Sequence, residues 1–120
     1  MKVPSELIPR VVTRLKALAD ENRIRLLLLL KQGPANVSTL TGKLGIAQAS
    51  VSKHLSILRH AGLLDVQRRG TQAVYSIRDQ SIFDLCRIVC EGVVRFVDEE
   101  HAALNLAGHS PSDPLYGAPS

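Results

Sequence analysis

Residues 48–56 combine side chains that could read duplex DNA. On a helical wheel, Val51, Leu55 and Leu58 share one face, which we expect to be buried. The opposite face carries short polar side chains and one cation: Ala49, Ser52, Lys53, Ser56 and His60. Small side chains allow a helix to enter the major groove of B-DNA, which is about 12 Å wide. This segment is therefore the first candidate for a binding surface.

Two residues of its first turn have the chemistry for contact with bases. Glutamine can bond bidentately to adenine, and serine can bond to any base, so Gln48 and Ser50 are predicted to meet base edges. A lysine on such a face more often contacts phosphate, which is the role expected for Lys53.

A second basic feature follows this helix. Residues 64–68 and 73–77 are predicted strands, separated by a turn that contains Gly70. Arg68 and Arg69 flank that turn and would reach a phosphate or the minor groove. We expect Gly70 to provide the positive φ that the turn needs.

Composition supports a nucleic-acid partner and excludes some alternatives. The chain has 120 residues, a formal net charge of +4, 45% hydrophobic residues and only 3% aromatic residues. The shortage of aromatics disfavours modules that stack bases on aromatic platforms. Cations gather in residues 43–78, where Asp65 is the one acid, whereas residues 79–101 hold six acids and two arginines. The first of these segments is suited to phosphate.

The expected elements define a fold class: mainly α with a small β-hairpin. Helices are predicted over residues 5–18, from an Asp20 N-cap to about Gln32, over 39–44 with a Ser38 cap, over 47–60, and from Gln80 to about His101. A helix-turn-helix followed by a hairpin is a winged helix. We expect one DNA-binding and dimerisation domain over residues 1–104, and a disordered tail over residues 105–120.

Several segments together resemble the ArsR/SmtB family of bacterial winged-helix repressors. Residues 15–20 (LKALAD) and 22–26 (NRIRL) are similar to its opening signature. Residues 47–55 (AQASVSKHL) and 58–63 (LRHAGL) are similar to its recognition helix, and the segment from Arg68 to Tyr75 to its wing. Two positions depart from the pattern: Ala47 stands where a capping Ser or Thr is frequent, and Gly42 lies inside a helix.

The resemblance implies a homodimer built through the first and last helices, operator binding near a promoter, and release by an inducer. It points to Gln48, Ser50, Ser52 and His54 as DNA contacts. His54 lies at the edge of the buried face of its helix, so a half-buried structural role and a DNA contact both stay open. A duplex with an imperfect palindrome is the expected partner.

Dimerisation is also favoured by the apolar residues themselves. The last helix carries more of them than one side of a small domain can cover, and the first helix adds a second stripe. Burying both across a two-fold axis would satisfy them. The alternative is a monomer in which the last helix folds wholly onto its own domain.

Cys86 and Cys90, four residues apart on the last helix, are the candidate inducer site. Their Cβ atoms would lie about 5–6 Å apart, too far for an unstrained disulfide. Arsenite, antimonite or another soft metal ion could bridge the two thiolates. Redox or sulfur-species sensing and simple packing in a dimer interface are the alternatives. No other cofactor is expected, and Asp98 and His101 are interpreted as solvated surface.

Other functional classes of protein find little support in the sequence. The residues contain no nucleophile–base pair, phosphate loop or metal triad, so an enzyme is not expected. Met1–Arg10 lacks the apolar run of a signal peptide, and no stretch could span a membrane, so we expect a cytoplasmic protein. The remaining alternative is a winged helix that serves protein–protein or RNA contacts without binding an operator.

Overall fold

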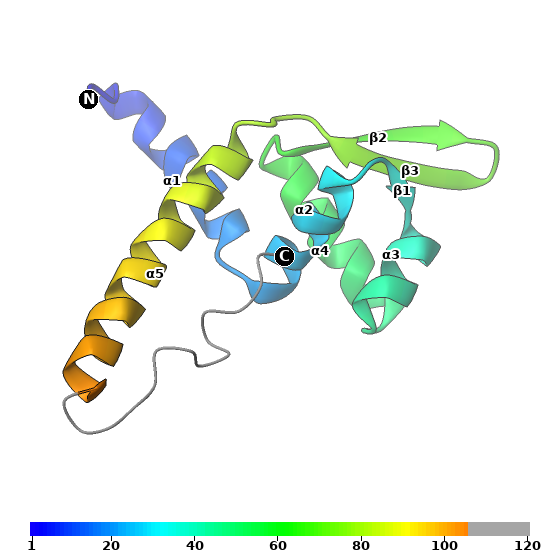
Figure 1. Ribbon diagram of the computed structural model, residues 1–120. Coiled ribbons are helices and arrows are strands. Elements are labelled where there is room, and N and C mark those ends of the chain that lie inside the picture. Colours follow the sequence, from blue (N-terminus) through cyan, green and yellow to red (C-terminus); the bar gives the residue numbers. More distant parts are fainter. Residues whose placement is uncertain (106–120) are drawn as a thin grey trace. The chain divides into compact units, whose positions relative to one another are not determined.

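The computed structural model describes residues 1–105, and the tail predicted over residues 105–120 lies almost wholly outside them. The chain forms two compact units, Met1–Asp79 and a second that begins at Gln80. The first contains η1 (Ser5–Leu7), α1 (Ile8–Leu18), α2 (Glu21–Lys31), β1 (Ala35–Asn36), α3 (Val37–Leu44), α4 (Gln48–His60), β2 (Leu64–Arg69) and β3 (Gln72–Ile77). The second contains α5 (Ile82–Asn105) (Figure 1).

The core of the first unit is built around α2, in which residues 26–30 are all leucine. Leu26, Leu27 and Leu30 are almost completely buried, while Leu28 and Leu29 are half-buried. The other fully buried large side chains come from α3, α4 and the start of the wing: Leu40, Val51, Leu55, Leu58, Leu63 and Leu64. A core made of aliphatic side chains holds α4 by one face and leaves the other face exposed.

The helix starts confirm one predicted cap and correct another. The Asp20 carboxylate accepts a hydrogen bond from the Arg23 N–H at 3.1 Å and so caps α2. The cap predicted at Ser38 is wrong, because α3 begins two residues earlier and Asn36 accepts the hydrogen bond from the Thr39 N–H at 2.8 Å. Ala47 precedes α4 and makes no side-chain cap.

The wing is a three-stranded antiparallel sheet in the order β1-β3-β2. The predicted hairpin is confirmed, with Arg69 paired to Gln72 across a two-residue turn. Gly70 has the expected positive φ of 64°. The two-residue strand β1 was not predicted, because Ala35–Asn36 is too short to show alternation and exists only by pairing with Tyr75 and Val74.

Two helices expose apolar side chains. On α1 and its preceding turn these are Leu7, Ile8, Val11, Val12 and Leu15. On α5 they are Leu85, Ile88, Val89, Val93, Val94, Phe96 and Leu104. Within residues 1–105, no helix combines the length and the hydropathy needed to cross a membrane.

Candidate nucleic-acid interface

The exposed face of α4 agrees with the face predicted from the wheel. Val51, Leu55 and Leu58 have no exposed surface, so they anchor the helix. The side chains predicted to contact DNA on this helix are exposed, with the exception of His54: Gln48, Ala49, Ser50, Ser52, Lys53 and Ser56. Because one face of α4 is buried, the opposite face presents a narrow polar surface to solvent.

The connection between α3 and α4 sets the angle of that surface. Gly45 ends α3 in a left-handed conformation with φ 76°, and its N–H donates to the Thr41 carbonyl at 2.9 Å. A residue with a Cβ would be strained at this φ, so glycine is required for the tight turn. The backbone N–H groups of Ser50 and Val51 then bond to the Ala47 carbonyl and begin α4.

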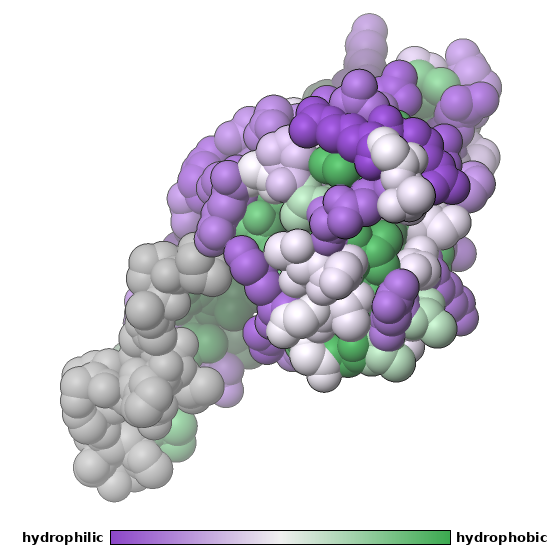
Figure 2. All heavy atoms as spheres, turned by 90° about the vertical axis from the view of Figure 1, so that its right-hand side faces the viewer, coloured by the Kyte–Doolittle hydropathy of each residue, from purple (hydrophilic) through white to green (hydrophobic). Residues whose placement is uncertain are grey.

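The wing presents its arginines to solvent. Arg68 and Arg69 are both exposed, and an Nη1 atom of Arg68 donates to the Thr71 carbonyl at 3.5 Å across the turn. The one acid of this region, Asp65, lies 3.9 Å from Arg78. Hydrophilic side chains gather over much of the face seen from the side of the wing (Figure 2). This part of the first unit therefore offers exposed positive charge beside α4.

His54 differs from the other predicted contacts because it is half-buried. Its Nδ1 atom lies 3.2 Å from an Nη1 atom of Arg23, which is in the first turn of α2. This contact is of the kind that a structural role for His54 requires, and it uses Nδ1 of the ring.

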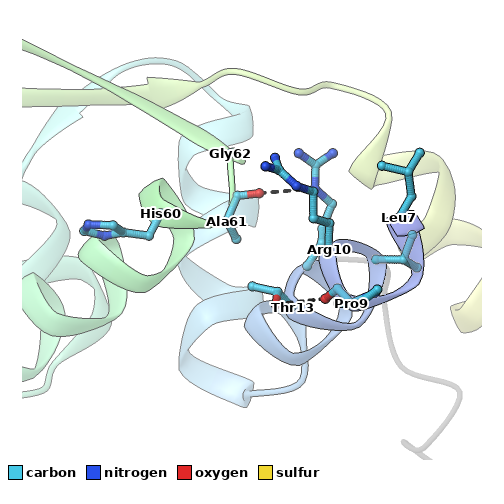
Figure 3. A pocket seen from close by; sticks show the side chains of 9 residues that line it. Leu7, Pro9, Arg10, Thr13, His60, Ala61 and Gly62 are labelled. Atoms are coloured by element: carbon cyan, nitrogen blue, oxygen red, sulfur yellow. Dashed lines mark hydrogen bonds between the residues drawn. The ribbon is translucent and has the colours of Figure 1, made fainter. Parts of the chain in front are cut away.

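Arg14 and Arg23 carry contacts that sequence reasoning missed. Arg14 donates to the carboxylate of Asp79 at 2.7 Å and to the Ala61 carbonyl at 3.2 Å, so it joins α1 to the end of α4. These contacts border a groove of about 490 Å³ whose lining includes Leu7, Arg10 and His60 (Figure 3). In the sequence, both arginines are indistinguishable from ordinary surface cations of helices.

The two cysteines of α5 are free thiols in different surroundings. Cys86 is half-buried and Cys90 is exposed. Burial raises the pKa of the Cys86 thiol, which disfavours the thiolate. No group of three or more metal-binding side chains occurs in residues 1–105. A metalloid bound here would therefore have two thiol ligands from one chain. A third ligand would have to come from another molecule.

The interpretation of Asp98 and His101 as solvated surface is half wrong. Asp98 is exposed, but His101 is only 8% exposed. His101 is not a second surface ligand beside Asp98.

Comparison with known proteins shows which family the chain resembles. The family model described as "bacterial regulatory protein, arsR family" matches residues 20–66. The HTH-type transcriptional regulator NmtR of Mycobacterium tuberculosis is 32% identical over 90% of this chain and 85% of its own. The arsenic resistance transcriptional regulator ArsR1 of Pseudomonas putida is 37% identical over 83% of this chain and 81% of its own.

A solved structure agrees with these sequence matches. It is the homodimeric winged helix-turn-helix DNA-binding domain (fragment 1–100) of a possible ArsR-family transcriptional regulator from Mycobacterium bovis. The similarity has a TM-score of 0.61 at 30% identity and covers 84% of this chain and 93% of that one. The predicted winged-helix class is thereby confirmed, and these relatives are transcriptional regulators rather than enzymes. The chain belongs to the arsR family of bacterial regulatory proteins.

Proposed function

We propose that the protein binds an imperfectly palindromic operator as a homodimer and represses transcription until an inducer releases it. The observation that carries this proposal is the polar face of α4 beside the basic wing. Gln48 and Ser50 would read base edges, while Lys53, Arg68 and Arg69 would hold phosphates. We infer that residues 1–104 act together as one DNA-binding and dimerisation domain.

The exposed apolar faces of α1 and α5 support the homodimer. Ile88, Val89, Val93 and Phe96 are each more than half exposed in the single chain. A contiguous apolar surface of this kind marks an interface in soluble proteins. A two-fold pair of chains would cover these faces and place two copies of α4 about one DNA turn apart.

A salt-titrated binding assay tests operator recognition. The probe is the promoter of the chain's own gene, and the control is a shuffled duplex of the same length. A specific complex should favour the promoter by at least about 10³-fold, and its affinity should fall steeply with salt. Equal binding to both duplexes, or binding to RNA or protein alone, would instead support the winged helix as a contact module without an operator.

We further propose that Cys86 and Cys90 bind arsenite or antimonite as the inducer. Their spacing places both sulfurs on one face of α5, and sulfur is the ligand that soft ions prefer. Each As–S bond forms as a thiol proton leaves with a hydroxide of arsenous acid as water. Because burial raises the pKa of the Cys86 thiol, this exchange starts from the protonated group. The names of relatives, including an arsenical resistance operon repressor of Bacillus subtilis, favour metalloids among the inducers considered.

Replacement of both cysteines separates this idea from its alternatives. The Cys86→Ser/Cys90→Ser protein should bind the operator as tightly as the wild type but ignore arsenite. Release of the double variant by arsenite would refute the thiol site. Release of the wild type by persulfide or peroxide alone would assign redox sensing, and no release by any of these compounds would leave the cysteines as packing residues.

A further inference from the structure

Arg23 links three helices through a single guanidinium group. Its Nε atom donates to the Ala17 carbonyl at 2.6 Å, and an Nη2 atom donates to the Lys16 carbonyl at 3.3 Å, both in the last turn of α1. Its Nη1 atom lies 3.2 Å from Nδ1 of His54 on α4 and 4.0 Å from the Asp20 carboxylate. The side chain is only 14% exposed, so water competes little for these bonds.

This contact determines the tautomer of His54. A guanidinium has donors and no acceptor, so Nδ1 of His54 has to accept the hydrogen bond. A neutral imidazole that accepts at Nδ1 carries its proton on Nε2. The ring therefore keeps a directed Nε2–H donor, on a helix whose neighbouring residue Lys53 is exposed.

Arg23 is also held in place independently of His54. The carbonyls at the end of α1 carry the negative end of its helix dipole, which favours a bound cation. The Asp20 side chain accepts from the Arg23 backbone N–H at 3.1 Å and fixes the start of α2. The guanidinium is thus a preformed support against which the imidazole rests.

We propose that Arg23 is a positioning residue for DNA binding: it orients the His54 ring and keeps it in the Nε2–H tautomer, so that Nε2–H donates to a DNA phosphate. This inference rests on the proposed DNA-binding function. It also ties the end of α1, a helix with an exposed apolar face, to the recognition helix through one side chain.

The tautomer can be measured without DNA. Two-bond ¹H–¹⁵N spectra of the full chain labelled at histidine distinguish Nε2–H from Nδ1–H rings, and the His54 signals are identified by their loss in His54→Gln. The wild type should show the Nε2–H form alone, whereas Arg23→Met, which removes every donor, should show a mixture. Arg25→Met is the matched control, since Arg25 on the same helix is exposed and forms an ion pair with Glu21 at 3.7 Å, on its own helix.

Two results would overturn the tautomer step: an Nδ1–H ring in the wild type, or an Arg23→Met spectrum identical to that of Arg25→Met. Should Arg23→Met fail to fold, Arg23→Lys takes its place, because one ammonium cannot span both carbonyls and the imidazole. The wild-type spectrum decides the tautomer in either case.

A double-mutant cycle on operator affinity tests whether Arg23 acts through His54. Glutamine at position 54 places an amide donor near the position of Nε2 without needing support at Nδ1. Arg23→Met should weaken operator binding about tenfold in the wild type but less than about twofold in His54→Gln. An equal loss in both backgrounds would show a general structural role and refute the proposal. A wild type without operator preference would defeat the proposed function, while the spectra would still decide the tautomer.

Discussion

Single side chains on α4 are expected to divide the binding of DNA between bases and phosphates. Lys53→Ala should weaken binding to operator and random duplex alike. It should also reduce the slope of log affinity against log salt concentration by about 1, because one phosphate contact is lost. Gln48→Ala should cost about 1–3 kcal/mol on the operator and little on random DNA, because it removes a bidentate base contact. Both side chains are exposed, so unfolding free energies should change by less than about 0.5 kcal/mol.

The measurement is a pair of salt-titrated binding curves for each variant on operator and random duplex. If Gln48→Ala lost the same binding free energy on both duplexes, the proposal that Gln48 reads bases would be refuted. A loss confined to the operator for Lys53→Ala would show that this lysine reads bases instead of holding phosphate.

Asp20 makes stability depend on acid pH. The hydrogen bond from the Arg23 N–H lowers the pKa of Asp20 below its ordinary 3.8, against an opposing effect of burial, and the Arg23 charge lowers it further. A carboxyl whose pKa is lower when folded contributes stability above its unfolded pKa and loses it as the pH falls through the folded value. The stabilisation should therefore be complete at pH 7 and decline below about pH 4.

Denaturant unfolding of two variants checks this dependence. Asp20→Ala should lose about 1 kcal/mol at pH 7 with the helix cap, whereas Asp20→Asn keeps a capping oxygen and should lose less. The difference between wild type and Asp20→Asn should shrink as the pH falls below 4. A difference that is constant from pH 7 to pH 3 would contradict an ionic contribution.

At the scale of elements, the helix-turn-helix contains two glycines with opposite requirements. Gly42 lies inside α3, where an added Cβ would meet nothing within 4 Å, so Gly42→Ala should raise the unfolding free energy by about 0.5–1 kcal/mol. Gly45 has equal space but a φ of 76°, so Gly45→Ala should lower stability by about 1 kcal/mol or more. Urea unfolding compares the two, and a stabilised Gly45→Ala would contradict the strained turn.

At the scale of the whole molecule, the exposed faces of α1 and α5 should decide the assembly. Val93 is 55% exposed in the single chain, so Val93→Asp should change its folding little but place a charge in the proposed interface. We expect a monomer by analytical ultracentrifugation and a loss of operator affinity, since one half-site then binds alone. Val93→Ile should keep the dimer. If the Val93→Asp protein were still a dimer, the interface would have to lie on another surface.

The sequence determined the class of fold and most of the candidate interface. The Asp20 cap located the start of α2. On α4, the 3.6-residue repeat of apolar side chains identified Val51, Leu55 and Leu58 as the buried face. The hairpin was equally visible, since a glycine-containing turn separates two segments with the composition of strands. The chemistry of the exposed face followed from the residues left over.

Tertiary structure decided what depends on contacts between distant residues. β1 exists only through its pairing with β3, and Asn36 rather than Ser38 caps α3. The bonds of Arg14 to Ala61 and of Arg23 to His54 span 47 and 31 residues, and no local pattern encodes such pairs. Propensity and periodicity act over a few residues, whereas hydrogen bonds between helices depend on where the folded core places each backbone.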